Sequence, residues 1–227
     1  MIEEVLRFVE LNYFLLIYGL AWIISIIFYK KYFDTVLKYF PILIAYTFLN
    51  ELLGFLIGTS ENFAFFNNYE FSNDLLYNLY AIIFYPYFYL IYWKLTHKQQ
   101  HKNIIKIASI LSLLFFVLNI FYANPLLKVL YYSIVVFSII LVICLCIYLI
   151  DKKNDWRWNR EKYNIMTWVS LGLLVFHIFF PIIFLISFLN YDFWKKFNLW
   201  TIHKVIIIIM YLLFCVGFIV SRRKAFK

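Results

Sequence analysis

The stretch VLYYSIVVFSIILVICLCIYLI, residues 129–150, runs from end to end without a charged side chain. A helix that crosses about 30 Å of hydrocarbon needs about 20 residues, at a rise of 1.5 Å each. This stretch has that length, so it predicts a transmembrane helix. The whole chain has a matching composition, with 65% hydrophobic and 15% charged residues and a mean hydropathy of +0.82. Soluble domains carry a much larger charged fraction, so the sequence predicts an integral membrane protein.

Six further stretches have similar length and apolar character. With the one quoted above, the predicted spans are residues 11–29, 40–58, 75–93, 104–122, 129–150, 166–189 and 201–220. Helices of this length leave room only for connecting loops. We therefore expect an all-α, seven-helix bundle that forms a single transmembrane domain over residues 1–227. The opening MIEEVLRFVE is acidic and no small-residue cleavage site follows the first apolar run, so we expect this first helix to be retained.

The basic residues predict how the bundle is oriented. If the seven spans alternate, 16 of the 21 Lys and Arg residues fall on one side of the membrane. That set is Lys30, Lys31, Lys38, Lys94, Lys98, Lys102, Lys106, Lys152, Lys153, Arg157, Arg160, Lys162, Arg222, Arg223, Lys224 and Lys227. Cytoplasmic loops carry the excess of Lys and Arg, so the N-terminus is predicted outside and the C-terminus in the cytoplasm.

Two basic segments on the predicted cytoplasmic side have more than one interpretation. HKQQHKNIIK (residues 97–106) and DKKNDWRWNREK (residues 151–162) would attract anionic lipids of the inner leaflet. In the second segment Trp156 and Trp158 alternate with arginines, a composition that also suits docking of a cytoplasmic protein partner. Nucleic-acid binding by so short a loop is weakly supported, and the net charge of +9 is mainly a topology signal.

No motif for catalysis or for a cofactor is present. HExxH, GxSxG, GxGxxG and the P-loop pattern are all missing, so we expect no enzyme activity, no cofactor and no metal site. His97 and His101 are spaced i, i+4, which could clamp a metal on a helix, although a solvated pair is the alternative. We expect Cys144, Cys146 and Cys215 to be small apolar packing residues.

The polar pair Asn50 and Glu51 interrupts the second predicted span. Gly54 and Gly58 lie three and seven residues after Glu51, so the three share one helix face. Glycines in membrane helices mark places where another helix comes close. A carboxylate that points at lipid would cost about 3 kcal/mol. We therefore expect Glu51 to face protein, with Asn50 flanking the contact.

The sixth predicted span carries the partner that we expect for Glu51. His177 lies at a similar membrane depth, and Pro181 follows it by four residues, so the ring of Pro181 should bend the helix and free the carbonyl of His177. The expected contact joins Glu51 to the His177 side chain or to that carbonyl, directly or through a water. Which of the two side chains carries charge is left open.

A second polar level is predicted nearer the outer boundary. Asn78, Asn119, His203 and Lys204 lie there, and together with the aromatic loop NFAFFNNYEF (residues 62–71) they could line an outward-facing pocket. The alternative is that the amides and His203 only hydrogen-bond between helices, with Lys204 reaching to the interface. Both interpretations stay open, and the full set of candidate ligand or proton-site residues is Glu51, His177, Asn50, Asn78, Asn119, His203 and Lys204.

The segments TFLNELLG, DLLYNLYAIIFYPYFYLIYW, the FW pair at 193–194 and LWTIHKVIIIIMYLLFCVGFIV carry a family resemblance. Together with the N-out layout they make the chain similar to the N-terminal membrane region of some bacterial sensor histidine kinases and their stand-alone relatives. This resemblance implies a multi-pass protein of the bacterial inner membrane. It also implies signalling, here through a separate cytoplasmic partner.

Two classes of function remain. The first is a receptor-like or sensory membrane subunit, in which an outer pocket or an intramembrane proton site changes helix packing. The second is an oligomeric effector that permeabilises the inner membrane, as small helical proteins of antiphage or CRISPR systems do. A transporter is a weaker alternative, because no inverted repeat is evident.

Overall fold

The computed structural model describes residues 2–59, 70–153 and 161–223, with side chains described for residues 13–57, 73–153 and 161–223. Helices make up nearly all of this part of the chain, and it contains no β-strand. The long helices are α1 (Ile2–Ile27), α2 (Phe40–Thr59), α3 (Glu70–Leu95), α4 (Gln99–Ile120), α5 (Tyr131–Lys152), α7 (Ile165–Leu189) and α9 (Leu199–Val220). Two short helices, η1 (Tyr29–Lys31) and α8 (Tyr191–Lys196), lie in the connections. The all-α prediction is confirmed.

Six of these helices, α2, α3, α4, α5, α7 and α9, are long and apolar enough to cross a membrane. The apolar part of α1 within the described residues, Tyr13–Ile27, is shorter than a full span. Such a set of helices makes the chain a multi-pass membrane protein. Many large apolar side chains on the outside of the bundle are exposed, as expected where lipid replaces water as the solvent.

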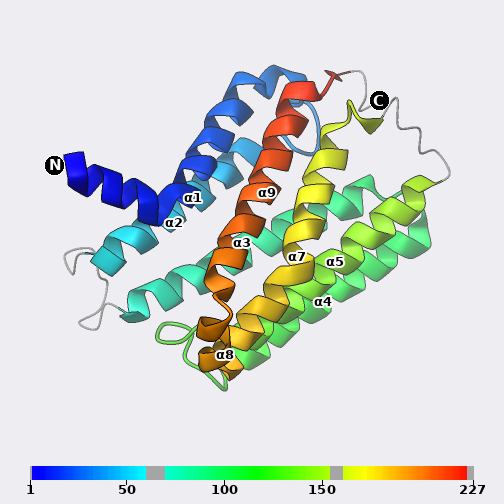
Figure 1. The fold of residues 1–227 in the computed structure, drawn as a ribbon. Coiled ribbons are helices and arrows are strands. Elements are labelled where there is room, and N and C mark those ends of the chain that lie inside the picture. The colour runs from blue at the N-terminus through cyan, green and yellow to red at the C-terminus, as the bar shows by residue number, and fades with distance from the viewer. Residues whose placement is uncertain (1, 60–69, 154–160, 224–227) are drawn as a thin grey trace.

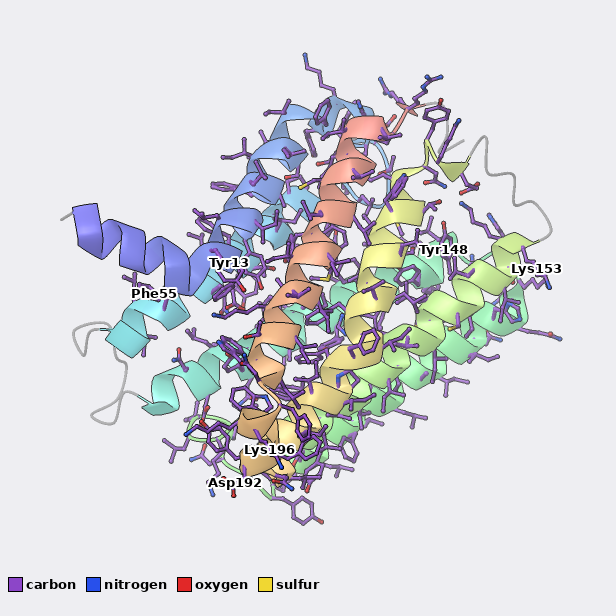
Figure 2. All side chains as sticks on the ribbon, viewed as in Figure 1. Tyr13, Phe55, Tyr148, Lys153, Asp192 and Lys196 are labelled. Atoms are coloured by element: carbon purple, nitrogen blue, oxygen red, sulfur yellow. The ribbon has the colours of Figure 1, made fainter. Side chains whose placement is uncertain are left out.

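The helices pack in a layered bundle, with α1, α2 and α9 on one side and α4 and α5 on the other (Figure 1). Helix α7 contacts both α9 and α5, and α3 contacts α2, α4 and α5. We call one end of the bundle the lysine-rich end (residues 28–39, 96–98, 161–164 and 221–223) and the other the lysine-poor end (residues 121–130 and 190–198). Figure 2 shows Lys153 far from Asp192 and Lys196, at opposite ends of the bundle.

Helices α7 and α9 make the most extensive helix–helix contact in the described chain, and one glycine from each allows it. A Cβ atom on Gly172 of α7 would lie 2.9 Å from the carbonyl oxygen of Met210 and 2.8 Å from the ring of Phe214. A Cβ atom on Gly217 of α9 would lie 2.8 Å from Cβ of Trp168. Such distances leave no room for a side chain, so the two backbones touch over this half of the pair.

The helix ends extend beyond the predicted spans, mostly towards the N-terminus. Helix α4 begins at Gln99 rather than at residue 104, and α3 begins at Glu70 rather than at residue 75. The apolar pattern marks only the segment in hydrocarbon, whereas a helix can continue with polar residues outside it. Helix α8 was not predicted, and the side chain of Asn190 caps its start by accepting a hydrogen bond from the N–H of Phe193 at 3.0 Å.

The prediction that the three cysteines are small packing residues holds for Cys144 and Cys215, which are buried, but not for Cys146, which is exposed. Cys144 and Cys146 are two residues apart, so they point to nearly opposite faces of one helix. Helix α7 continues through Pro181 to Leu189 as a single helix.

Candidate functional site

A cavity of about 80 Å³ lies inside the bundle between α1, α2, α3, α7 and α9. Seventeen residues surround it, and the polar ones are Tyr18, Thr47, Glu51, Tyr77, Tyr80, Tyr85, His177, His203 and Tyr211. A water molecule occupies about 30 Å³ of liquid, so the cavity has room for water or for part of a small ligand. Its wall is mostly apolar with a few convergent polar groups, which is typical of ligand sites.

Glu51 reaches this cavity from the middle of α2. Its side chain is half-buried and lines the cavity together with a second pocket of about 180 Å³ that also contains Asn50 and Gly54. A Cβ atom on Gly54 would lie 3.2 Å from Oδ1 of Asn73 in α3, so the glycine permits this approach of α3. The expectation that Glu51 faces protein beside a close helix contact is consistent with this arrangement.

His177 enters the same cavity from α7 and is almost completely buried, with 1% of its surface exposed. Its Nδ1 atom lies 2.8 Å from the hydroxyl oxygen of Ser138 in α5, and either atom can donate. Its Nε2 atom has no hydrogen-bond partner among the described residues. A buried polar atom without a hydrogen-bond partner lowers the stability of the folded state, so a functional role is one explanation for this nitrogen.

His203 of α9 lines the cavity near the lysine-poor end and has a second unpartnered nitrogen. Its Nδ1 atom is buried and has no hydrogen-bond partner in the described part of the chain. The imidazole ring is surrounded by aromatic rings, with centroid distances of 5.7 Å to Phe176, 5.7 Å to Phe180 and 5.8 Å to Trp200. Two histidines that line one aromatic cavity thus each have a buried ring nitrogen without a hydrogen-bond partner among the described residues.

The cavity shares lining residues with two pockets nearer the lysine-poor end. Tyr77 lines the cavity, the pocket beside Asn50 and a third pocket of about 210 Å³ that contains Asp74 and Trp194. Glu51 is shared by the cavity and the second pocket, and His203 by the cavity and the third. We call these three adjoining spaces the vestibule.

The predicted candidates divide into two groups. Glu51, His177 and His203 line one cavity, and Asn50 lines the adjoining pocket. No hydrogen bond or ion pair joins Glu51 to His177 among the described residues, and the side-chain partner of His177 is Ser138. The direct contact that the sequence suggested is therefore replaced by a shared cavity.

Asn78 and Asn119 serve packing instead. The Nδ2 atom of Asn78 donates to the carbonyl oxygens of Pro125 and Lys128 at 2.7 and 2.8 Å, and its Oδ1 atom accepts from the N–H of Leu130 at 2.9 Å. This side chain fastens α3 to the loop before α5. Asn119 donates to the hydroxyl of Ser133 at 2.8 Å and joins α4 to α5. Both amides hydrogen-bond between structural elements, and Asn119 also lines a separate pocket of about 570 Å³ between α4, α5 and α7.

Lys204 lies beside the vestibule over a group of aromatic rings. Its ammonium nitrogen is 5.2 Å from the ring centroid of Phe14 and 5.0 Å from that of Trp200, and both rings line the second pocket. Such distances are those of cation–π interactions. The aromatic loop of residues 62–71 and the tryptophans at 156 and 158 fall almost entirely outside the described residues.

Several cavity residues were missed from the sequence. Thr47 donates to the carbonyl oxygen of Leu43 at 2.9 Å and lies 3.2 Å from the hydroxyl of Tyr80, and Tyr18 and Tyr211 stack edge to face at 4.5 Å. The high aromatic content of the chain hides such tyrosines, because they do not differ in sequence from those that face lipid. Thr47, a hydroxyl-bearing residue within the apolar run of α2, was the signal in the sequence that could have indicated this site.

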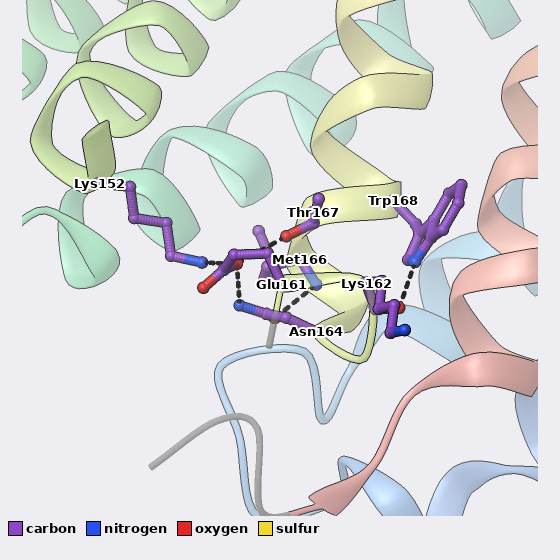
Figure 3. A network of polar contacts seen from close by, with 7 residues as sticks. All are labelled: Lys152, Glu161, Lys162, Asn164, Met166, Thr167 and Trp168. Carbon is purple, nitrogen blue, oxygen red and sulfur yellow. Dashed lines mark hydrogen bonds and ion pairs between the residues drawn. The ribbon is translucent and has the colours of Figure 1, made fainter. Parts of the chain in front are cut away.

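The lysine-rich end contains a polar network of a different kind, in which a buried carboxylate has several hydrogen-bond donors. The carboxylate of Glu161 accepts hydrogen bonds from Lys152, from Thr167 at 2.9 Å and from Asn164 at 3.1 Å (Figure 3). Burial raises the pKa of this carboxyl, but these donors outweigh burial and hold the pKa below its usual value. The network connects the end of α5 to the start of α7.

Further contacts fasten α9 at the same end. The Nζ atom of Lys31 donates to the carbonyl oxygen of Ile219 at 2.6 Å, and Arg223 forms an ion pair with Asp34 at 2.8 Å. The guanidinium of Arg222 lies 4.0 Å from the ring centroid of Tyr163. These contacts join the ends of α1, α7 and α9, so a displacement of α9 would also displace the ends of α1 and α7.

The suggested metal pair has another role. The Nδ1 atom of His101 forms a hydrogen bond with the carboxylate of Asp151, and the backbone N–H of His97 donates to the same carboxylate at 3.2 Å. No group of three or more metal-ligating side chains is found among the residues that the structure describes. The two histidines thus help to join α4 to α5.

No protein-family model, no curated protein and no solved structure matches the chain.

Proposed function

We propose that this protein is a sensory or receptor-like membrane subunit in which occupancy of the vestibule changes the packing of α7 against α9. The observation that carries the proposal is the buried cavity with unpartnered nitrogens on His177 and His203 beside the carboxylate of Glu51. Ionisable groups within membrane segments are costly, and they usually mark a functional site. A purely structural polar cluster would satisfy its own hydrogen bonds, as the network at Glu161 does.

A route from the vestibule to the other end follows from the helices that line it. His177 and His203 belong to α7 and α9, which touch at Gly172 and Gly217 and reach the lysine-rich end. Packed interfaces of this kind respond to a ligand by shifting between discrete arrangements. A cytoplasmic protein partner would detect the changed arrangement at the ends of α7 and α9.

The proposal includes seven transmembrane helices with α1 as the first, an N-terminus outside and a C-terminus in the cytoplasm of a bacterial inner membrane. The distribution of Lys and Arg supports this orientation. A reporter that works only in the cytoplasm should be active when fused after Lys227 and inactive when inserted at Asn68. Activity at Asn68 would overturn the orientation and the helix count.

The coupling itself can be tested without knowing the stimulus. Spin labels at Lys162, just before α7, and at the exposed Ile219 of α9 report the separation of these two helices at the lysine-rich end. We expect Glu51→Gln to change the distance distribution, because it removes the ionisable carboxyl group of the cavity. A matched substitution at the exposed Ile209, Ile209→Leu, should leave it unchanged. Identical distributions for Glu51→Gln and the unchanged chain would contradict the proposed coupling.

The effector hypothesis predicts a different result in cells. An oligomeric pore would dissipate the membrane potential after induced expression, whereas a sensory subunit leaves it intact. We expect an unchanged potential at an expression level matched to another multi-pass protein. A collapse of the potential would replace the sensory proposal by the effector hypothesis.

A further inference from the structure

The vestibule combines carboxyl groups with aromatic surface. No Lys or Arg lines any of its three adjoining spaces, whereas Glu51 lines two of them and Asp74 lines the third. The remaining wall is largely aromatic, with Tyr77, Tyr80 and Phe180 among its members. A carboxylate beside the faces of aromatic rings is the environment that stabilises an organic cation.

We propose that the vestibule binds a small organic ammonium ion with N–H groups, such as a primary arylalkylamine. This inference rests on the proposed sensory function and names the ligand class of the same site. The charged head would sit in the inner cavity against Glu51, and the organic tail would extend into the outer pockets. The cavity of about 80 Å³ fits the head alone, and the adjoining pockets of about 180 and 210 Å³ accommodate the tail.

The unpartnered nitrogens favour an ammonium with N–H groups over a quaternary one. Nε2 of His177 and Nδ1 of His203 both lie buried at the cavity without a partner among the described residues. Nε2 of His177 accepts an N–H from the ligand when Nδ1 carries the ring proton and donates to Ser138, whose hydroxyl oxygen then accepts. A quaternary ammonium has no N–H to offer and would leave both nitrogens bare.

Lys204 shows that the rings at the mouth of the vestibule accept an ammonium group. Its nitrogen lies within 5.5 Å of the ring centroids of Tyr13, Phe14 and Trp200. Phe14 and Trp200 also face the second pocket, where Glu51 is found. The ammonium group of Lys204 thus lies over Tyr13, Phe14 and Trp200. The ligand would instead contact the aromatic rings that line the inner cavity with Glu51.

The test uses the full-length protein in lipid nanodiscs, with phenethylamine, 2-phenylethanol and tetramethylammonium as probes. At about ten times its Kd, phenethylamine should raise the melting temperature by roughly 3 to 6 °C. The neutral 2-phenylethanol has the same ring and chain and should give no comparable shift. Tetramethylammonium should bind at least about tenfold more weakly than phenethylamine, because it lacks N–H donors.

Variants locate the binding. Glu51→Gln should abolish the shift by phenethylamine, whereas Glu161→Gln, which removes the same charge outside the vestibule, should retain it. If Glu51→Gln fails to fold, Ala81→Leu provides a second route, because Ala81 lines the cavity and a larger side chain would fill it while Glu51 remains. We expect loss of binding in Ala81→Leu as well.

Several results would overturn the ammonium proposal. An equal shift by 2-phenylethanol would indicate an apolar cavity only, and an equal loss in Glu161→Gln would indicate non-specific charge attraction. Absence of a shift with phenethylamine, at a concentration near its solubility limit, would also contradict it. In each case a changed spin-label distance in Glu51→Gln would still support the sensory function, so the two proposals fail separately.

Discussion

The two halves of the α7–α9 pair differ in how tightly the helices pack and in whether their buried polar groups are hydrogen-bonded. Towards the lysine-rich end, Gly172 and Gly217 bring the backbones into contact, and Glu161 nearby has a full set of donors. Towards the lysine-poor end the same helices surround a cavity, where His177 and His203 keep unpartnered nitrogens. In the packed half the two helices fill the space between them and the buried Glu161 carboxylate has donors. The cavity in the other half is therefore a separate feature of the fold, which we explain by function.

The largest effect on stability is expected from adding a methyl group where α7 and α9 touch in the packed half. Gly172→Ala would place a methyl group 2.9 Å from the carbonyl oxygen of Met210, which belongs to the backbone and cannot move aside. Overpacking of this kind costs about 1–3 kcal/mol, so the melting temperature in detergent should fall by several degrees.

Gly19 of α1 is the matched control for this substitution. A Cβ atom there would lie 3.6 Å from the ring of Phe48, an ordinary contact. Alanine stabilises a helix by roughly 0.5–1 kcal/mol relative to glycine, so Gly19→Ala should melt at or above the temperature of the unchanged chain. Equal losses in both variants would mean that the backbones at Gly172 do not touch.

A second effect is expected from the polar network of the packed half. Glu161→Ala removes the acceptor for Lys152, Thr167 and Asn164 and should cost about 1–3 kcal/mol, because the bonds involve a charged group. Thermal unfolding at neutral pH measures this loss. Thr167→Val removes one donor only and should cost less, and the reverse order would contradict the central place of Glu161 in the network.

The pH dependence of stability gives an independent test of the same carboxylate. The pKa of Glu161 is lower in the folded protein than its ordinary value of 4.5. Its contribution is therefore fully present above pH 4.5 and is lost as the pH falls through the lower folded pKa. The difference in melting temperature between the unchanged chain and Glu161→Gln should shrink below pH 4.5. A constant difference down to pH 3 would show that the charge of Glu161 is not the stabilising feature.

The smallest effect on stability is expected in the open half. Glu51→Gln keeps the size of the side chain, and no hydrogen bond joins Glu51 to His177 in the described chain. The melting temperature should therefore change by the equivalent of less than about 1 kcal/mol. A loss as large as that of Glu161→Ala would assign Glu51 to structure and remove the contrast between the two halves.

The sequence predicted the helical membrane fold because apolar length is a local property. It also singled out Glu51, His177 and His203, since polar groups are costly in lipid. It placed His203 at a separate, outer level, whereas in the structure all three line one cavity. It did not predict the contact at Gly172 and Gly217, because close approach depends on which helices are neighbours. For the same reason it suggested a pair of Glu51 and His177, whereas the neighbouring α5 provides Ser138 as the partner of His177.

The proposed function depends on a vestibule that a small ligand can enter, next to a packed half that it cannot enter, and two buried hydroxyl residues test this most directly. Thr47 lines the cavity and is 3% exposed, and Ser170 is 0% exposed and bonds to Tyr92 at 3.0 Å outside the cavity. In a Cys146→Ser background, Thr47→Cys and Ser170→Cys can be exposed in intact cells to a small, positively charged methanethiosulfonate reagent. We predict that Thr47→Cys reacts at least about tenfold faster and is protected by phenethylamine. Equal rates, or faster reaction of Ser170→Cys, would contradict the claim.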